Sequence, residues 1–249
     1  ATCIALPSNQ PIDPNRNQGE LMRVTNLEQP FHPLYNYAVI TDADEGLILI
    51  NIDTFADGEP RNNHIERALT WDGGGILRGA RHVALGGYYA YVIADIGLVV
   101  VDLNDPLAPK AVATIALNGG QASALQFRYL FVTDRDGLKV VDVTAPSQPR
   151  LVADNTIPIA DAHRVYVART YAYVAAGADG IVIVDAERPE QLREFTRFNA
   201  DGELKDSRDV IVATTNASLF GYVADGSGGL KVLQLTSPAS QPKYYGFSP

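Results

Sequence analysis

An internal repeat constrains this chain more than any other feature of its sequence. Each copy holds a Tyr-rich run, a short link rich in Asp and Gly, and then a glycine followed by four mostly aliphatic residues and a polar one. Aligned on that glycine, five copies follow one another at steps of 51, 40, 43 and 49 residues, at Gly46, Gly97, Gly137, Gly180 and Gly229. Self-similarity at this period is typical of proteins built from stacked supersecondary units.

The residues of each copy predict four short antiparallel strands. The runs 98–101 (Leu-Val-Val-Val) and 181–184 (Ile-Val-Ile-Val) are β-branched and lack a helical period, as in strands buried on both faces. The Tyr-rich run before each glycine predicts a partner strand, and links such as 134–137 (Asp-Arg-Asp-Gly) suit a tight hairpin. Segments such as 81–85 and 110–115 add a first and a fourth strand. Four strands without an intervening helix predict a propeller blade.

Aspartates that close the third strand have a structural interpretation. Asp102, Asp142 and Asp185 are each followed four positions later by a proline. An Asp side chain hydrogen-bonds backbone two residues on, and Pro fixes φ in the turn. We therefore predict that these aspartates form turns and take no part in catalysis.

The fold class predicted from these patterns is all-β, a five-bladed β-propeller of four-stranded antiparallel blades in a single domain over residues 1–249. Residues 1–19 form an N-terminal segment, interpreted either as the end of a third strand from a preceding blade or as a ring-closing strand. The predicted blades span about 20–78, 79–119, 120–160, 161–205 and 206–249.

The tract from Gly97 to Asp102, with a Tyr-Ala-Tyr-Val run before it and Asp-Pro after it, resembles the LVIVD repeat. The resemblance extends from about residue 80 to residue 242. It implies a β-propeller and an extracellular, cell-surface or periplasmic location. It assigns no catalytic residue, because the matching positions are strand core and turns.

Composition excludes several classes of partner. The formal net charge is −9 and the isoelectric point is about 4.9, which disfavours nucleic acid. The longest apolar runs fall far short of the roughly 20 residues of a membrane-spanning helix, so no membrane insertion is expected. The expected partner is another protein or another region of a larger parent assembly.

Candidate site residues lie where each blade's first strand begins. Comparison of the segments at 22–23, 81–82, 123–124, 163–164 and 208–209 predicts a ligand-binding ring made of Arg23, Arg81, His82, His163, Arg164, Arg208 and Asp209. Bidentate arginines favour an anion, whereas His82, His163 and Asp209 are weak candidates for a transition-metal site. A hydrogen-bonded network without a ligand is the third alternative. Aspartates of the hairpins leave calcium open, although the sequence contains no EF-hand loop.

The sequence therefore favours a non-enzymatic scaffold that mediates protein–protein interaction in a secreted or cell-surface assembly. The insert at 54–78 is a candidate contact region, because long loops on a repeat scaffold commonly carry function. One alternative is a propeller with an anion or metal site at a channel mouth. A second is a glycoside-type hydrolase with an unrecognised carboxylate set. Glu66, Glu190, Glu194 and Glu203 lie outside the first-strand positions, so no catalytic residue is assigned.

Overall fold

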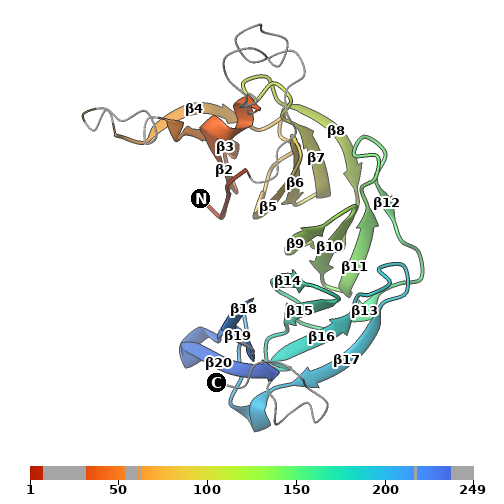
Figure 1. Cartoon of the computed structure of the whole chain (residues 1–249). Helices are drawn as coiled ribbons and strands as arrows, with labels where there is room; N and C mark the ends of the chain where they lie inside the picture. Colours follow the sequence, from red (N-terminus) through yellow and green to blue (C-terminus); the bar gives the residue numbers. More distant parts are fainter. Residues whose placement is uncertain (8–31, 54–60, 62, 216–217, 237–249) are drawn as a thin grey trace, which may run out of the picture. The chain divides into compact units, whose positions relative to one another are not determined.

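The computed structural model describes residues 1–7, 32–53, 61, 63–215 and 218–236. The fold that these residues form is all-β (Figure 1). Five antiparallel sheets, each taken from one stretch of chain, hold all the strands in these residues. The chain divides into two compact units, one of residues 1–117 and 145–149 and the other of residues 118–144 and 150–249. The single domain over 1–249 therefore stays a prediction. None of the helices in the described residues is long and apolar enough to cross a membrane.

The first unit holds two four-stranded sheets in simple up-and-down order. Sheet 1 runs β1 (Cys3–Ala5), β2 (Tyr37–Asp42), β3 (Gly46–Asn51) and β4 (Glu66–Trp71), with the 3-10 turn η2 (Pro33–Asn36) ahead of β2. Sheet 2 runs β5 (His82–Gly86), β6 (Tyr89–Ala94), β7 (Gly97–Asp102) and β8 (Lys110–Ile115). The two sheets pack through a buried aliphatic cluster that includes Leu47, Leu49, Val99 and Val101.

The N-terminal strand differs from the sequence interpretation. Residues 1–19 were interpreted either as the end of a third strand from a preceding blade or as a ring-closing strand, and in the structure Cys3–Ala5 pairs antiparallel with β2, with Cys3 opposite Thr41. It occupies the first-strand position of sheet 1, so this sheet includes a strand that lies ahead of the predicted blade start near residue 20.

The second unit holds the other three sheets. Sheet 3 runs β9 (Ala122–Gln126), β10 (Tyr129–Asp134), β11 (Gly137–Asp142) and β12 (Arg150–Leu151), and β13 (Ile157–Pro158) also pairs with β11. Sheet 4 runs β14 (Val165–Ala168), β15 (Tyr171–Ala175), β16 (Ile181–Asp185) and β17 (Arg193–Phe198). Sheet 5 runs β18 (Asp209–Thr215), β19 (Ser218–Ala224) and β20 (Leu230–Thr236), with the turns η5 (Ala200–Gly202) and η6 (Gly226–Gly228) beside it. The fourth strand expected for this last predicted blade would fall within residues 237–249, which lie outside the described residues.

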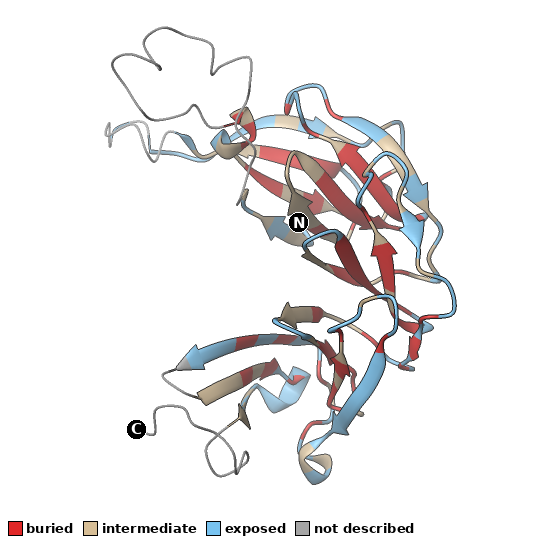
Figure 2. Ribbon diagram, turned by 45° about the vertical axis from the view of Figure 1, so that its right-hand side comes forward, coloured by how far each residue is buried: buried red, intermediate tan, exposed pale blue. Residues whose placement is uncertain are grey.

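The aliphatic runs that define the repeat form the core. The strands β7, β11 and β16 are buried almost throughout, whereas every residue of the outer strand β17 is exposed. Figure 2 shows this gradient as red on the middle strands and pale blue on the outer ones. The register shifts by one residue between the third and fourth strands of sheets 1, 2 and 4, each time in the same part of the strand pair.

The turn-forming aspartates behave as predicted. Asp102 Oδ1 accepts the N–H of Asn104 at 2.8 Å, and Asp142 Oδ1 accepts that of Thr144 at 2.8 Å. Asp185 Oδ1 accepts the N–H two residues on at 3.0 Å in the same way. Their shared role is local turn geometry.

Candidate functional site

The residue that leads into the first strand occupies one equivalent position in all five sheets. In every case its backbone N–H donates to a carbonyl near the end of the second strand of the same sheet. The five donor residues are Thr2 (2.7 Å), Arg81 (2.9 Å), Gln121 (2.8 Å), His163 (2.9 Å) and Arg208 (2.8 Å). This entry position is the structural counterpart of the ring predicted from sequence.

The hydrogen bonds place the entry position differently from the sequence comparison in two of the five segments compared. In sheet 3 the entry residues are Gln121 and Ala122, two positions before the predicted pair at 123–124. In sheet 1 the position belongs to Thr2, and the predicted Arg23 lies outside the described residues.

In the first unit, the predicted residues Arg81 and His82 lie at the start of β5. The Arg81 Nε donates to the Gly79 carbonyl at 3.0 Å, and its guanidinium forms an ion pair with Asp95. His82 is half-buried within the sheet. Arg81 is therefore already engaged by its own hairpin.

In the second unit, His163 and Arg208 come from neighbouring sheets and touch. Arg208 Nη1 lies 3.0 Å from His163 Nε2, and Asp161 Oδ1 lies 3.1 Å from the same nitrogen. Arg208 Nε also pairs with Asp206 at 2.5 Å. The ring nitrogen accepts from Arg208 or donates to Asp161, and one atom cannot do both at once.

The remaining predicted residues of this unit take different positions. Arg164 is half-buried, and its carbonyl accepts the Ala175 N–H at 2.9 Å. Asp209 is exposed and accepts the N–H of Val210 at 2.8 Å.

A pocket of about 330 Å³ opens at this place in the second unit. Its lining consists of Gln121, Arg135, Ala160, Asp161, Ala162 and His163. The imidazole of His163 is mostly buried, whereas Asp161 is more than half exposed. Arg135 is exposed, and its guanidinium makes no hydrogen bond or ion pair with any described residue. The sequence prediction missed Arg135 and Gln121, because it aligned first strands and ignored the hairpin that faces them.

The metal candidates do not form a cluster in the part of the chain that the structure describes. Within it, no three His, Cys, Asp or Glu side chains are grouped so as to hold a metal ion. His82 lies in the first unit and His163 and Asp209 in the second. The metal site therefore stays a prediction without a described ligand cluster.

The hairpin aspartates were candidates for binding calcium. In the structure they mostly accept hydrogen bonds from backbone N–H groups. Asp134 is fully buried, pairs with Lys139 Nζ at 2.7 Å and accepts the Asn118 N–H at 3.2 Å. Asp225 is 1% exposed and accepts the N–H groups of Lys205 and Asp206 at 3.0 and 2.8 Å. Burial raises the pKa of Asp225, but these hydrogen bonds outweigh it and hold the pKa below its usual range. Both carboxylates fasten the loop that enters the first strand of their sheet.

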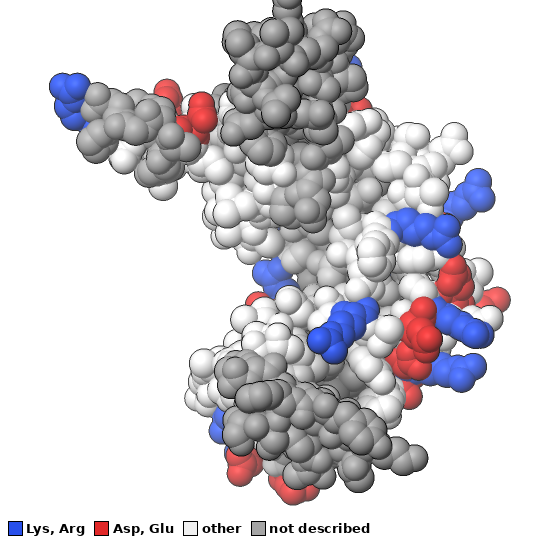
Figure 3. Space-filling model, in the orientation of Figure 1, with Lys and Arg blue, Asp and Glu red and all other residues white. Residues whose placement is uncertain are grey.

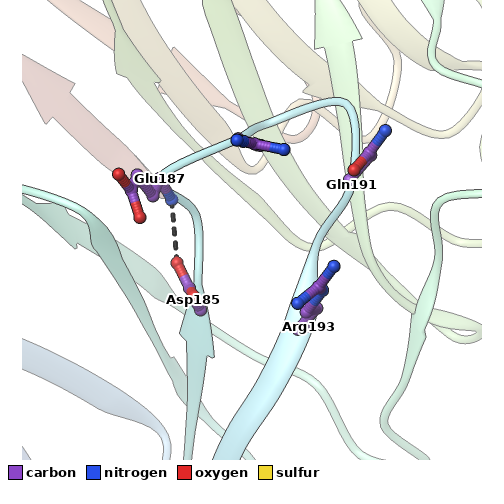
Figure 4. Close-up of a pocket in the computed structure, with 5 residues that line it drawn as sticks. Asp185, Glu187, Gln191 and Arg193 are labelled. Atoms are coloured by element: carbon purple, nitrogen blue, oxygen red, sulfur yellow. Dashed lines mark hydrogen bonds between the residues drawn. The ribbon is translucent and has the colours of Figure 1, made fainter.

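Two further pockets lie at the Asp-x-x-x-Pro turns. One, of about 260 Å³, is lined by Asp185, Glu187, Arg188, Gln191 and Arg193 (Figure 4). Asp102 and Lys110 line a smaller one of about 80 Å³ at the equivalent turn of sheet 2. Because the hollow recurs at equivalent positions, we attribute it to the turn geometry of the repeat.

The carboxylates considered for hydrolysis lie on outer strands, turns and loops. Glu190 accepts the Tyr129 hydroxyl, which lowers the pKa of the glutamate, and Arg128 lies 3.5 Å away. Glu194 pairs with Arg197 at 2.8 Å. Glu66 and Glu203 are exposed. The described contacts of Glu190 and Glu194 are those of surface ion pairs.

One exposed aromatic residue escaped the sequence analysis. Phe127 is 93% exposed in the two-residue turn between β9 and β10, and its φ is +53°. The first turn residue is also left-handed in the hairpins of sheets 2 and 4, where it is Gly87 and Arg169. The sequence signal that could have revealed it is a Phe at the position that a glycine fills in the repeat before it.

Comparison with known proteins fits this architecture. The family model of the LVIVD repeat matches residues 78–115, 120–155 and 160–198, which are sheets 2, 3 and 4. The chain contains three LVIVD repeats. The repeat matches and the strand order within each sheet together support a β-propeller repeat fold for this LVIVD-repeat protein. No curated protein sequence matches it.

Two solved structures are similar to the LVIVD-repeat chain. The computationally designed Ika8 protein matches with a TM-score of 0.55 and 14% identity, over 80% of this chain. The match covers 56% of the designed protein, and this likeness is one of fold alone. The Cps50 (Swd1) β-propeller domain of Myceliophteria thermophila matches with a TM-score of 0.46 and 13% identity, over 81% of this chain and 70% of that one.

Proposed function

We propose that this LVIVD-repeat protein is a non-enzymatic scaffold that binds a protein partner in a secreted or cell-surface assembly. The repeated residues support this proposal, because the described ones serve the core and the turns. The observation that carries it is the exposed Phe127 at the tip of the β9–β10 hairpin.

Phe127 is unfavourable for the isolated protein in two ways. A left-handed backbone costs a residue with a Cβ about 1–2 kcal/mol, and glycine at this position, as in Gly87, avoids that cost. The ring also gains little from folding, since 93% of the residue is exposed. Backbone strain of this kind gathers at functional sites.

Side-chain contacts tie the residues around Phe127 to their neighbours. The Gln126 side-chain amide donates to the Arg169 carbonyl at 2.8 Å, which joins this hairpin tip to that of the next sheet. The Arg128 guanidinium lies 5.0 Å from the centre of the Tyr129 ring, whose hydroxyl donates to Glu190. An aromatic anchor with a charged rim is typical of protein interfaces. The partner expected here offers an apolar pocket with polar edges.

We expect the contacts around Phe127, and not a broad surface charge, to determine which partner binds. On the face shown in Figure 3, acidic and basic side chains lie beside one another instead of gathering by sign. A broad one-sign field would instead point to electrostatic steering.

The test uses three baits, namely the wild type and the variants Phe127→Gly and Arg169→Gly. Both substitutions relieve a left-handed turn residue, but only the first removes the aromatic ring. Each bait captures proteins from a native extract, and mass spectrometry compares what is retained. The expected partner is held by wild type and Arg169→Gly and lost with Phe127→Gly.

The purified partner should then bind Phe127→Gly at least tenfold more weakly, while the melting temperature of this variant is kept or raised. A partner that Phe127→Gly retains in full, or the lack of any protein that depends on the ring, contradicts this proposal. Fractionation of native cells tests the location, and recovery from the cytosol alone would contradict it.

The five-bladed ring is part of the proposal. Aligned on the repeat glycine, Leu230 is equivalent to Leu47, Leu98 and Leu138. Those three are 0% exposed, whereas Leu230 is 69% exposed in β20. In a closed ring of five blades, Leu230 would be buried like its equivalents Leu47, Leu98 and Leu138.

A further inference from the structure

We infer that the pocket lined by Gln121, Arg135, Asp161 and His163 binds a small carboxylate that carries a hydroxyl or ammonium group on the adjacent carbon. This site lies entirely within the second unit and is independent of the scaffold proposal. Its volume of about 330 Å³ falls at the lower end of the range for small-molecule sites.

The pocket walls are fixed before any ligand arrives. Gln121 and His163 lead into β9 and β14, and their N–H groups are held by the second strands at 2.8 and 2.9 Å. The buried Thr133 hydroxyl donates to the His163 carbonyl and so joins sheet 3 to the loop of sheet 4. A binding site built on such fixed elements loses little entropy when a ligand binds.

Arg135 supplies the group that recognises a carboxylate. It follows Asp134, which is buried and held by Lys139 and by backbone. The Arg135 N–H donates to the Asn118 carbonyl at 2.9 Å, which fixes the backbone, while the guanidinium lacks a partner among the described residues. A planar guanidinium matches a carboxylate with two parallel hydrogen bonds.

The charge balance favours a singly charged group. Arg208 is paired with Asp206, and His163 lies within 3.1 Å of Asp161. Arg135 is the one permanently charged cation in the lining of this pocket, and the Asp161 carboxylate, which lines the same pocket, opposes a second negative charge on the ligand. A carboxylate, with one negative charge, fits that balance better than a phosphate dianion.

Asp161 accounts for the donor group on the ligand. Its carboxylate is 58% exposed and lines the pocket, and it shares His163 Nε2 with Arg208. An ionised carboxylate accepts up to about four hydrogen bonds, so Asp161 can accept one from a hydroxyl or ammonium beside the carboxylate that Arg135 holds.

NMR titration of the purified chain tests the site with lactate, alanine and propionate. The three probes share a carboxylate and a methyl group, and they differ in carrying a hydroxyl, an ammonium or only hydrogen on the carbon between them. We expect saturable shifts of the amide signals around Gln121 and His163, with lactate or alanine binding at least threefold tighter than propionate. Whichever of lactate and alanine binds more tightly shows whether the site prefers a hydroxy acid or an amino acid.

Two variants locate the binding. Arg135→Gln should weaken the binding of lactate and of alanine at least tenfold. Arg188→Gln, at the turn pocket of the same unit, should leave the affinity for both probes unchanged. Asp161→Asn should lower the advantage of lactate and alanine over propionate. Equal effects of Arg135→Gln and Arg188→Gln, or no saturable shift with any probe, would overturn the inference.

Discussion

Aspartates at the end of the second strand show how single residues hold a repeat together. Asp134 and Asp225 are almost fully buried, yet each accepts backbone N–H groups from the loop that enters its own sheet. Burying a carboxylate is costly unless hydrogen bonds replace the lost water. Sheet 4 has Ala176 near this position, and there Gly177 and Ser207 exchange backbone hydrogen bonds at 3.0 Å.

The lowered pKa of Asp225 predicts a specific loss of stability in acid. A carboxyl that is more acidic when folded stabilises the protein above its unfolded pKa of about 3.9, and this contribution is lost as the pH falls through the lower folded value. Urea midpoints measured from pH 6 to pH 2 should therefore fall less steeply for Asp225→Asn than for the wild type. An unchanged slope would show that Asp225 does not contribute.

For single residues, the sequence predicted hydrogen bonds within a turn better than it predicted the residues of a binding site. Asp102 and Asp185 were correctly predicted as turn formers, because their hydrogen bonds reach only two residues along the chain. Arg135 was missed because its pocket is completed by residues of another sheet's entry loop. Phe127 was missed because exposure and φ are not visible in a run of apolar letters.

The hairpin between the second and third strands depends on its glycine. Gly137 has a φ of +130°, and a Cβ there would lie 2.0 Å from the Ile157 carbonyl oxygen. Gly97 meets Ile115 in the same way at 2.2 Å. The outer part of the sheet therefore packs directly on the glycine.

Substitution of this glycine should be far more damaging than that of another left-handed glycine. Gly87 has a φ of +57° with open space around it, so Gly87→Ala should cost only the left-handed penalty of about 1 kcal/mol. Gly137→Ala adds a backbone overlap and should cost more than about 2 kcal/mol. Urea unfolding compares the two, and equal losses would contradict the steric argument.

Element prediction succeeded where strands were long and consecutive and failed where one was short and distant. The β6–β7 pair was predicted from adjacent β-branched runs. Strand β1 has only three residues and pairs with a strand more than 30 residues away, Cys3 opposite Thr41. Its sequence also resembles the turn after a third strand, so the local pattern left both a preceding blade and a ring-closing strand open.

At the scale of the whole molecule, the decisive comparison is between equivalent leucines. Leu138 is completely buried, so Leu138→Ala should cost about 2–5 kcal/mol. If the five sheets close into one ring, Leu230→Ala should also cost at least about 2 kcal/mol, and we expect that result. A loss below about 0.5 kcal/mol, as for an ordinary surface site, would refute the closed five-bladed ring.

The register shift beside the outer strand bears on how such repeats diverge. In sheets 1, 2 and 4 the fourth strand holds one extra residue relative to the third. The inside–outside alternation of the last strand is thereby uncoupled from that of the inner three. A lineage can accept substitutions or a one-residue change at the periphery without moving an aliphatic side chain out of the interior. The outer strands are therefore free to acquire new binding specificities while the repeated interior stays recognisable.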